Sequence, residues 1–249
     1  MDWTAILGLL AAGALAGVLS SLFGIGGGIV LVPVLHYLLG FGWVEATQLS
    51  LVAIMAQSPT GVWQHARRGA VDWRVALPLA LAGLLGVVIG DVLQPLVAVP
   101  WLKVLFAALM ALAALRLAVP QPPVAPDAKP LGLAGLSVLG LAAGIVAKLL
   151  GIGGGLVTVP VLTLTGLPVH LAVGSSLVPV FTNAAVASGQ ALAHGLDWLP
   201  AVPLALGALA GVPFGARLAH SLKEQGLRRV FAVGLVLAAL YIGFTSGLR

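Results

Sequence analysis

The sequence contains no cysteine and very few charged residues. The absence of cysteine excludes disulfide bonds and thiolate metal sites, although it does not identify a cellular compartment. Only 8% of the 249 residues are Asp, Glu, Lys or Arg, whereas 60% are hydrophobic, which is far from the balance of a soluble domain. A helix needs about 20 apolar residues to cross a bilayer core of about 30 Å, and stretches of this kind fill nearly the whole chain. The sequence therefore predicts an all-α polytopic membrane protein.

Several motifs of enzymes and of ATP-driven proteins are also missing. The chain has no P-loop G-x-x-x-x-G-K-[ST] and no H-E-x-x-H metal motif. Its seven acidic residues are scattered over termini, loops and segment ends, whereas an active site would gather a nucleophile, an acid–base pair or metal ligands. We therefore expect no enzyme, no catalytic residue, no metal, no cofactor and no nucleic-acid partner.

One glycine-rich motif occurs twice. Residues 24–35 read GIGGGIVLVPVL and residues 151–162 read GIGGGLVTVPVL, so ten of twelve positions are identical at a spacing of 127. The similarity continues beyond the motif, because residues 69–90 parallel residues 195–215. Ser50 and Gln64 also fall opposite Ser176 and Gln190 at a spacing of 126. The chain is therefore predicted to be an internal duplication.

A segment rich in proline, VPQPPVAPDAKP, separates the two copies, and its prolines and charges do not suit lipid. It divides the chain into a first membrane repeat at 1–118, a cytoplasmic linker at 119–130 and a second membrane repeat at 131–249. Apolar segments follow the same order in both repeats. They lie at 4–22, 29–40, 45–62, 74–92 and 101–118, and at 131–149, 156–166, 169–190, 199–216 and 226–247.

The second segment of each repeat is too short to cross a bilayer with ease. Twelve residues of helix reach only about 18 Å, so each segment is either a short crossing or a re-entrant piece. The positive-inside rule distinguishes the topologies. Five crossings per repeat with an outside N-terminus leave two basic residues, Lys103 and Arg249, outside. The nine on the cytoplasmic side are then Arg67, Arg68, Arg74, Arg116, Lys129, Arg217, Lys223, Arg228 and Arg229.

Four crossings per repeat would split the same residues six against five, which fits the rule less well. We therefore predict two inverted repeats of about five membrane segments each, with short broken half-helices after the glycine-rich turns. Eight crossings, arranged 4+4, are the alternative. In the five-segment topology both termini face the periplasm, and loops 63–73, 119–130 and 217–229 face the cytoplasm.

The glycine-rich turns are candidate anion-binding elements, expected to face each other around one central site. Irregular backbone at membrane depth is tolerated where it is buried in protein or lines a watery cavity. Each turn leads into a helix whose first N–H groups have no partner within the helix, and such an end attracts anions. Close packing of helices is the alternative explanation. The candidate binding residues are Gly24, Gly26, Gly27, Gly28, Gly151, Gly153, Gly154 and Gly155.

Glycines outside the two turns have a simpler interpretation. We expect them only to allow close helix packing, in the manner of small-xxx-small contacts. They are Gly8, Gly13, Gly17, Gly83, Gly86, Gly207 and Gly211.

The motif and its surroundings resemble the TauE/SafE family of sulfite and organosulfonate exporters. The resemblance rests on the two Gly-x-Gly-Gly-Gly motifs, each followed five residues later by a proline (Pro33, Pro160), in a duplicated chain of this length. It implies a secondary transporter in a bacterial inner membrane that exports small sulfur-containing anions by alternating access. Sulfite, sulfoacetate, sulfolactate, taurine and thiosulfate are the candidates it offers. An anion channel, or a transporter of another small anion, is the alternative.

The expected partners are a small anionic substrate and the lipid bilayer. The sequence leaves the oligomeric state open, with a homodimer as one option.

Polar residues inside apolar segments are further candidates, because ionisable and polar groups are costly there. Lys148 stands three residues before the second motif, where the first repeat has Ser21, and either supplies charge to an anion site or snorkels to the interface. Gln57 and Asn183 occupy equivalent positions and can donate hydrogen bonds to an oxyanion. Ser20, Ser50, Ser175 and Ser176 could add hydroxyl donors, with helix–helix hydrogen bonding as the alternative.

A few residues at segment ends have structural interpretations. Asp72 and Asp197 each precede a tryptophan at an expected helix start and are predicted N-caps, while Asp91 either lines the pathway or lies at the exit interface. An interfacial belt is expected from Trp43, Trp63, Trp73, Trp101 and Trp198.

Overall fold

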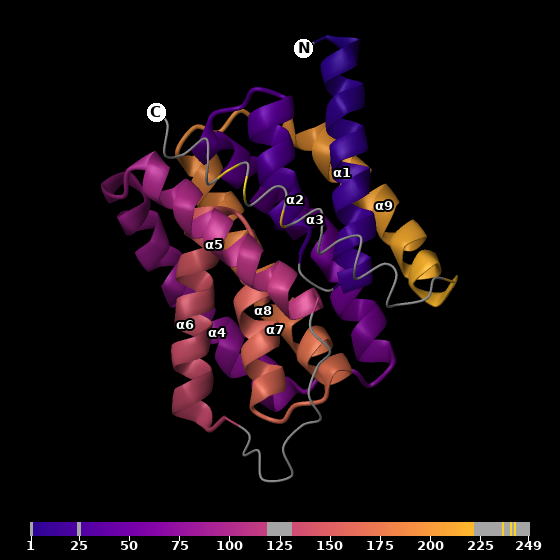
Figure 1. The fold of residues 1–249 in the computed structure, drawn as a ribbon, viewed down its shortest axis with the longest axis vertical. Coiled ribbons are helices and arrows are strands. Elements are labelled where there is room, and N and C mark those ends of the chain that lie inside the picture. The colour runs from indigo at the N-terminus through magenta and orange to yellow at the C-terminus, as the bar shows by residue number, and fades with distance from the viewer. Residues whose placement is uncertain are drawn as a thin grey trace.

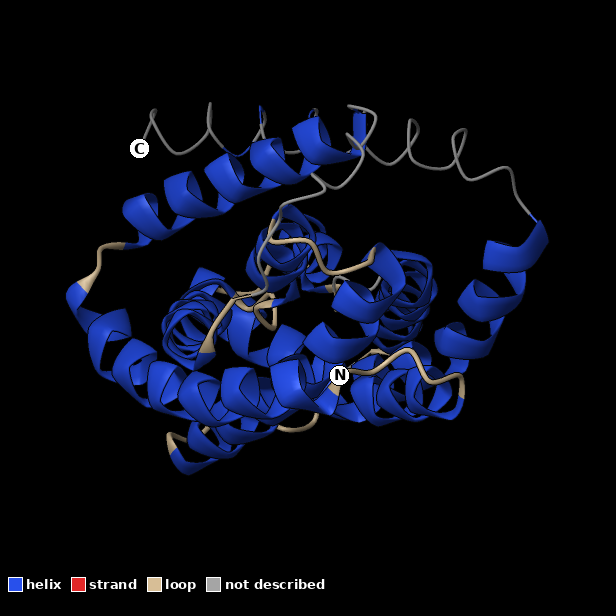
Figure 2. Ribbon diagram, turned by 90° about the horizontal axis from the view of Figure 1, so that it is seen from below, coloured by secondary structure: helices blue, strands red, loops and turns tan. Residues whose placement is uncertain are grey.

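The computed structural model describes residues 2–23, 26–118 and 131–221, together with Val236, Leu240 and Ile242. The predicted linker 119–130 and most of the predicted segment 226–247 therefore lie outside the described residues. Figure 2 shows the described residues as helices joined by short loops, with no strand among them. In chain order the elements are α1 (Trp3–Phe23), α2 (Gly28–Pro33), the π-helical turn η1 (Val34–Leu38), α3 (Trp43–Arg67), α4 (Trp73–Leu93), the 3-10 turn η2 (Gln94–Leu96), α5 (Val99–Ala118), α6 (Leu133–Leu150), α7 (Gly155–Leu164), α8 (Val169–Ala193) and α9 (Ala201–Ser221).

The described helices have the length and surface of membrane spans. Four stretches of the described residues are long and apolar enough to cross a bilayer: Trp3–Ser21, Trp73–Leu96, Leu133–Leu150 and His170–Ala193. The outer face of α4 exposes Leu77, Leu81 and Leu85 to the surroundings, which is the face a helix turns towards lipid. The all-α, polytopic prediction is therefore confirmed.

The two short segments are also present as predicted. Apolar helix after the first glycine turn runs from Gly28 to Leu38, and after the second from Gly155 to Leu164. Eleven and ten residues of helix span only about 15 Å, about half of a bilayer core. In α2 the helix changes to a π-helical turn directly after Pro33, whereas α7 continues through Pro160.

Helices of one predicted repeat pack on helices of the other. The first helix of each, α1 and α6, lies along the fourth helix of the opposite one, so that α1 pairs with α9 and α6 pairs with α4 (Figure 1). Close packing at both pairs depends on glycine. A Cβ at Gly17 would collide with the carbonyl of Ala208, and one at Gly144 with the carbonyl of Gly83.

The packing role expected of isolated glycines is confirmed where the facing group is backbone. Cβ atoms would collide with the opposite helix at Gly13, Gly17, Gly86, Gly207 and Gly211. The other two face side chains, because Gly8 meets Leu39 and Gly83 meets the amide of Asn183.

The third helices, α3 and α8, pack against each other inside this arrangement. Each has 25 residues and carries buried polar side chains that no other described helix matches in number. On α3 these are Thr47, Ser50, Gln57 and Ser58, and on α8 they are Ser175, Ser176, Asn183 and Ser188. Because both helices are shielded from lipid by their neighbours, polar groups can lie at membrane depth.

The two aspartates predicted as N-caps differ in what they cap. Asp72 is the N-cap of α4, where its Oδ1 accepts from Arg74 N at 2.9 Å. Asp197 makes the same contact with Leu199 N at 2.9 Å, but α9 begins only at Ala201. Asp197 therefore caps the turn that precedes this helix.

The prediction of an interfacial belt was wrong for one tryptophan. Trp63, Trp73, Trp101 and Trp198 are exposed, but Trp43 is only 3% exposed. Its ring packs edge-on against Phe106, with 5.4 Å between ring centroids, because α5 covers the start of α3 at this point. Trp43 therefore belongs to the protein core.

Candidate functional site

The two glycine-rich turns meet at the centre of the protein. A Cβ at Gly28 would collide with the carbonyl of Gly151, so the backbones of the turns are in direct contact. Gly26 and Gly153 both lie against the side chains of Ile54 and Val180, which come from α3 and α8. The expectation that the motifs face each other agrees with this geometry, although apolar side chains rather than open space lie against both turns.

The positive φ angles in these turns explain the choice of glycine. Gly27 and Gly154 are the N-caps of α2 and α7, with φ of 76° and 90°. Such angles disfavour any residue with a Cβ. A Cβ at Gly27 would lie 2.8 Å from the carbonyl oxygen of Ala16, and one at Gly154 would lie 2.8 Å from that of Ala143. Equivalent glycines therefore rest against equivalent helices.

The remaining glycines of the two motifs complete these turns. Gly151 ends α6 with φ of 72°, and its N–H donates to the carbonyl of Ala147 at 2.9 Å. Gly155 is the first residue of α7 and is buried. Gly24 lies outside the described residues.

Gln57 and Asn183 occupy equivalent positions but differ in their hydrogen bonds. Gln57 donates from Nε2 to the carbonyl of Gly26 at 2.9 Å, which ties α3 to the first turn. Asn183 is fully buried, and neither its Nδ2 nor its Oδ1 has a hydrogen-bond partner in the described part of the chain. Buried polar atoms without partners are rare, and each needs an explanation such as a ligand or water.

Three of the four candidate serines make hydrogen bonds that hold the fold. Ser50 donates to the carbonyl of Gly151 at 2.8 Å, and Ser176 donates to the carbonyl of Val173 at 2.8 Å. Ser175 Oγ accepts from the backbone N–H of Asp72 at 2.9 Å. The Ser50 and Ser175 bonds connect separate segments, which matches the alternative structural role, whereas the Ser176 bond stays within α8.

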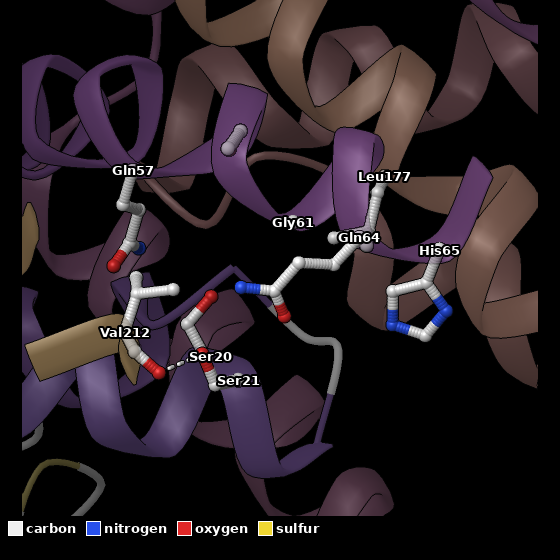
Figure 3. A pocket seen from close by; sticks show the side chains of 9 residues that line it. Ser20, Ser21, Gln57, Gly61, Gln64, His65, Leu177 and Val212 are labelled. Atoms are coloured by element: carbon white, nitrogen blue, oxygen red, sulfur yellow. Dashed lines mark hydrogen bonds between the residues drawn. The ribbon is translucent and has the colours of Figure 1, made fainter. Parts of the chain in front are cut away.

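A small polar cavity lies beside the first turn, with a volume of about 30 Å³. Figure 3 shows Gln64 reaching from α3 towards Ser20 and Ser21 of α1, with Gln57 on the same side. Its full lining is Ser20, Ser21, Gln57, Ser58, Gly61, Gln64, His65, Leu177 and Val212. Such a volume suffices for water.

Two donors in this cavity are available for a ligand. Ser21 is occupied, because its hydroxyl donates to the carbonyl of Val212 at 3.0 Å, and Ser58 donates to the carbonyl of Ile54 at 2.6 Å. The side chains of Ser20 and Gln64 make no hydrogen bond within the described residues. A hydroxyl and an amide are both able to donate to an oxyanion.

Lys148 is buried and paired with an acidic residue. Its Nζ lies 2.7 Å from Oδ1 of Asp91, and the side chains are 1% and 19% exposed. The lysine therefore does not reach the surface as a snorkelling side chain would, and in this conformation a carboxylate already neutralises it. Asp91 in turn lies near His194, whose Nδ1 is 3.9 Å from the same carboxylate oxygen.

Two features of this region were missed at the sequence level. The contact between Lys148 and Asp91 was one, because the two residues stand on different predicted segments. It could have been predicted from the rule that two ionisable residues in apolar surroundings are expected to pair. Gln64 was not among the candidate residues, although the repeat places it opposite Gln190 at a spacing of 126. No cluster of three or more possible metal ligands occurs among the described residues.

Comparison with known proteins gives a consistent result over nearly the whole chain. The family model described as "Sulfite exporter TauE/SafE" matches residues 9–242. A "Probable membrane transporter protein" of Xylella fastidiosa (strain 9a5c) is 32% identical over 247 residues, which cover 95% of this chain and 94% of the relative. A protein of the same description from Haemophilus influenzae is 30% identical, covering 96% of this chain and 98% of the relative. No solved structure matches the chain.

Proposed function

This chain belongs to the TauE/SafE sulfite exporter family and is a multi-pass membrane transporter, and on that premise we propose that it exports small sulfur-containing anions. Sulfite, sulfoacetate and related organosulfonates are the proposed substrates, carried across a bacterial inner membrane by alternating access. The matched family and the two similar glycine turns support this choice of substrate class.

The proposed architecture is two inverted repeats. In Figure 1, α1 begins at the top beside the N-terminus, whereas α6 begins at the bottom, so the two equivalent helices run in opposite directions. The exchanged pairing of α1 with α9 and α6 with α4 supports the same arrangement. Inverted repeats provide alternating access, because one half can rock against the other around a fixed central site.

The observation that carries the proposal is a set of polar side chains on α1, α3 and α8 that have no hydrogen-bond partner among the described residues. The amide of Asn183 has none among the described residues, and Ser20 and Gln64 face a cavity beside the first turn. Uncharged donors suit an oxyanion that must also leave, because a fixed opposite charge would hold it more tightly. In the proposed site the cavity receives the anion, Asn183 binds it at the centre, and the N–H groups at the start of α7 assist.

Flux into liposomes containing the purified protein tests the proposal. Sulfite, sulfoacetate, thiosulfate, sulfate and chloride would be compared, with pH and membrane potential varied independently. We expect saturable exchange of sulfite, sulfoacetate or thiosulfate that a second member of these three inhibits, with sulfate and chloride as the comparison anions. Export could draw on the potential, which supplies about 2.3 kcal/mol per charge per 100 mV.

The control is the Asn183→Leu, Gln64→Leu double variant in the same liposomes. Flux that never saturates and follows only the potential would indicate an anion channel. Saturable exchange of sulfate or chloride without any sulfite or organosulfonate flux would overturn the proposed substrate class.

A further inference from the structure

The helix pair α1–α9 and its equivalent α6–α4 pack in the same way but carry different side chains at one position. Ser21 and Lys148 occupy equivalent positions, 127 residues apart. A Cβ at Gly215 would lie 2.8 Å from Cβ of Ser21, and a Cβ at Gly90 would lie 2.8 Å from Cβ of Lys148. Two equivalent helix pairs therefore differ at this position: α1 and α9 hold a short hydroxyl, whereas α6 and α4 hold a long cation.

The cavity beside Ser21 follows one face of α3. Gln57, Gly61 and Gln64 stand at intervals of four and three residues, which places them on one side of a helix, and all three line the cavity. In the second repeat the same positions are Asn183, Ala187 and Gln190 on α8.

His194 continues this face of α8 by one more turn. Both Asn183 atoms and Oε1 of Gln190 are buried without a hydrogen-bond partner among the described residues, and His194 is 59% exposed. Unpaired polar atoms thus run from the centre of α8 towards its exposed end. Such a row is costly in a membrane protein unless water or another polar species reaches it.

The outer end of this row carries an ion pair. Asp91 on α4 lies 2.7 Å from Nζ of Lys148 and 3.9 Å from Nδ1 of His194, which is the last residue of the row. We propose that Asn183, Gln190 and His194 line the second half of the anion path, and that the Lys148–Asp91 ion pair closes this half in the present conformation. This inference rests on the inverted-repeat arrangement proposed above.

The chemistry of the pair explains how the path could open. Separating two buried, paired charges is unfavourable because each then lies in the protein without an opposite charge. The closed state is therefore stable until another charged group replaces one of the two partners. An anion that arrives along the row of Asn183 and Gln190 offers Lys148 a second negative partner. The substrate itself would then weaken the contact between Lys148 and Asp91. The first half of the path has Ser21 in place of the lysine, so no ion pair has to separate there.

Thiol labelling tests the closure directly, because the chain has no cysteine of its own. Gln64→Cys and Gln190→Cys would be placed in separate copies of the protein in lipid nanodiscs, which expose both faces to iodoacetate, a small anionic thiol reagent that contains no sulfur. The same two cysteines would then be combined with Lys148→Met and Asp91→Asn, which remove both charges together and leave neither buried alone.

We expect the cysteine at 64 to react at the same rate in both backgrounds. The cysteine at 190 should react slowly in the parent and at least about tenfold faster in the double variant, because opening no longer separates buried charges. Exchanging the charges, Lys148→Asp with Asp91→Lys, should restore slow labelling, and the unchanged rate at 64 shows that the double variant is still folded.

Equal rates at 190 in all three backgrounds would overturn the closure by this ion pair. A rate at 190 that stays near zero throughout would overturn the second half-path. No sulfur anion takes part in the labelling, so a failure here is distinguishable from a wrong substrate assignment.

Discussion

The amide of Gln57 donates to the carbonyl of Gly26 at 2.9 Å, whereas Asn183, its equivalent in the second repeat, has no hydrogen-bond partner among the described residues. One amide therefore stabilises a turn, and the other remains available for a ligand.

Replacing each amide with leucine should separate these two roles. Gln57→Leu leaves the carbonyl of Gly26 without its donor, which typically costs about 1–3 kcal/mol, so the melting temperature should fall. Asn183→Leu removes two unpaired polar atoms and should leave the melting temperature unchanged or higher, while anion transport falls. Melting in detergent and flux in liposomes measure the two effects. The opposite assignment, with transport lost only in Gln57→Leu, would contradict the proposed site.

The N-cap glycines Gly27 and Gly154 should tolerate alanine equally badly. Each has a positive φ, and an added Cβ would lie 2.8 Å from a helix carbonyl oxygen. Strain of roughly 1–3 kcal/mol and a lower melting temperature are therefore expected in both variants. Under the proposed function their anion affinity should fall as well, because each turn shifts away from the helix against which it rests.

Gly189→Ala is the matched control for these two variants. It lies inside α8 with nothing within 4 Å of an added Cβ, so alanine there should be neutral or stabilise the protein by about 0.4–1 kcal/mol. Variants at Gly27 and Gly154 that melt earlier but bind sulfite normally would show that the turns serve packing alone.

Much of the fold could be predicted because apolar length and periodicity are local properties. The short segments at Gly28–Leu38 and Gly155–Leu164 are visible as apolar runs between glycines. Which side chains lie in the site does not depend on local sequence alone. Whether Ile54 and Val180 fill the space between the turns depends on how α3 crosses α8.

The pairing of Lys148 was equally hard to predict. Its partner Asp91 stands 57 residues earlier and has alanine, Ala216, at the equivalent position of the second repeat, so the duplication contains no sign of the contact. Trp43 misled for a similar reason, because only the three-dimensional position of α5 decides that it is covered.

Opposite faces of the membrane should be accessible near the ends of α3 and α8. Arg68 follows α3 and Leu199 follows α8, and both are exposed. In the inverted topology Arg68→Cys reacts with an impermeant thiol reagent only from the cytoplasm, and Leu199→Cys only from the periplasm. Intact cells and inside-out vesicles provide the two faces. Labelling of both positions from one face would favour the eight-crossing arrangement.

The cavity donors give the most specific prediction about the anion. Gln64 lines the cavity and makes no hydrogen bond within the described residues, so its amide can donate to a bound oxyanion. Losing one hydrogen bond to a charged group typically costs about 1.5–3 kcal/mol, so Gln64→Leu should weaken sulfite binding by roughly tenfold to a hundredfold. Gln64→Asn keeps the amide and should retain part of the affinity.

Gln48→Leu serves as the control, because this glutamine stands on the same helix, is half-buried and does not line the cavity. Binding of sulfite to the purified variants by calorimetry measures all three affinities, with melting temperatures recorded beside them. Since Gln64 holds no part of the described fold by hydrogen bonds, Gln64→Leu should melt like the parent. If Gln48→Leu and Gln64→Leu weaken binding equally, the loss reflects α3 as a whole, and the anion does not contact the cavity.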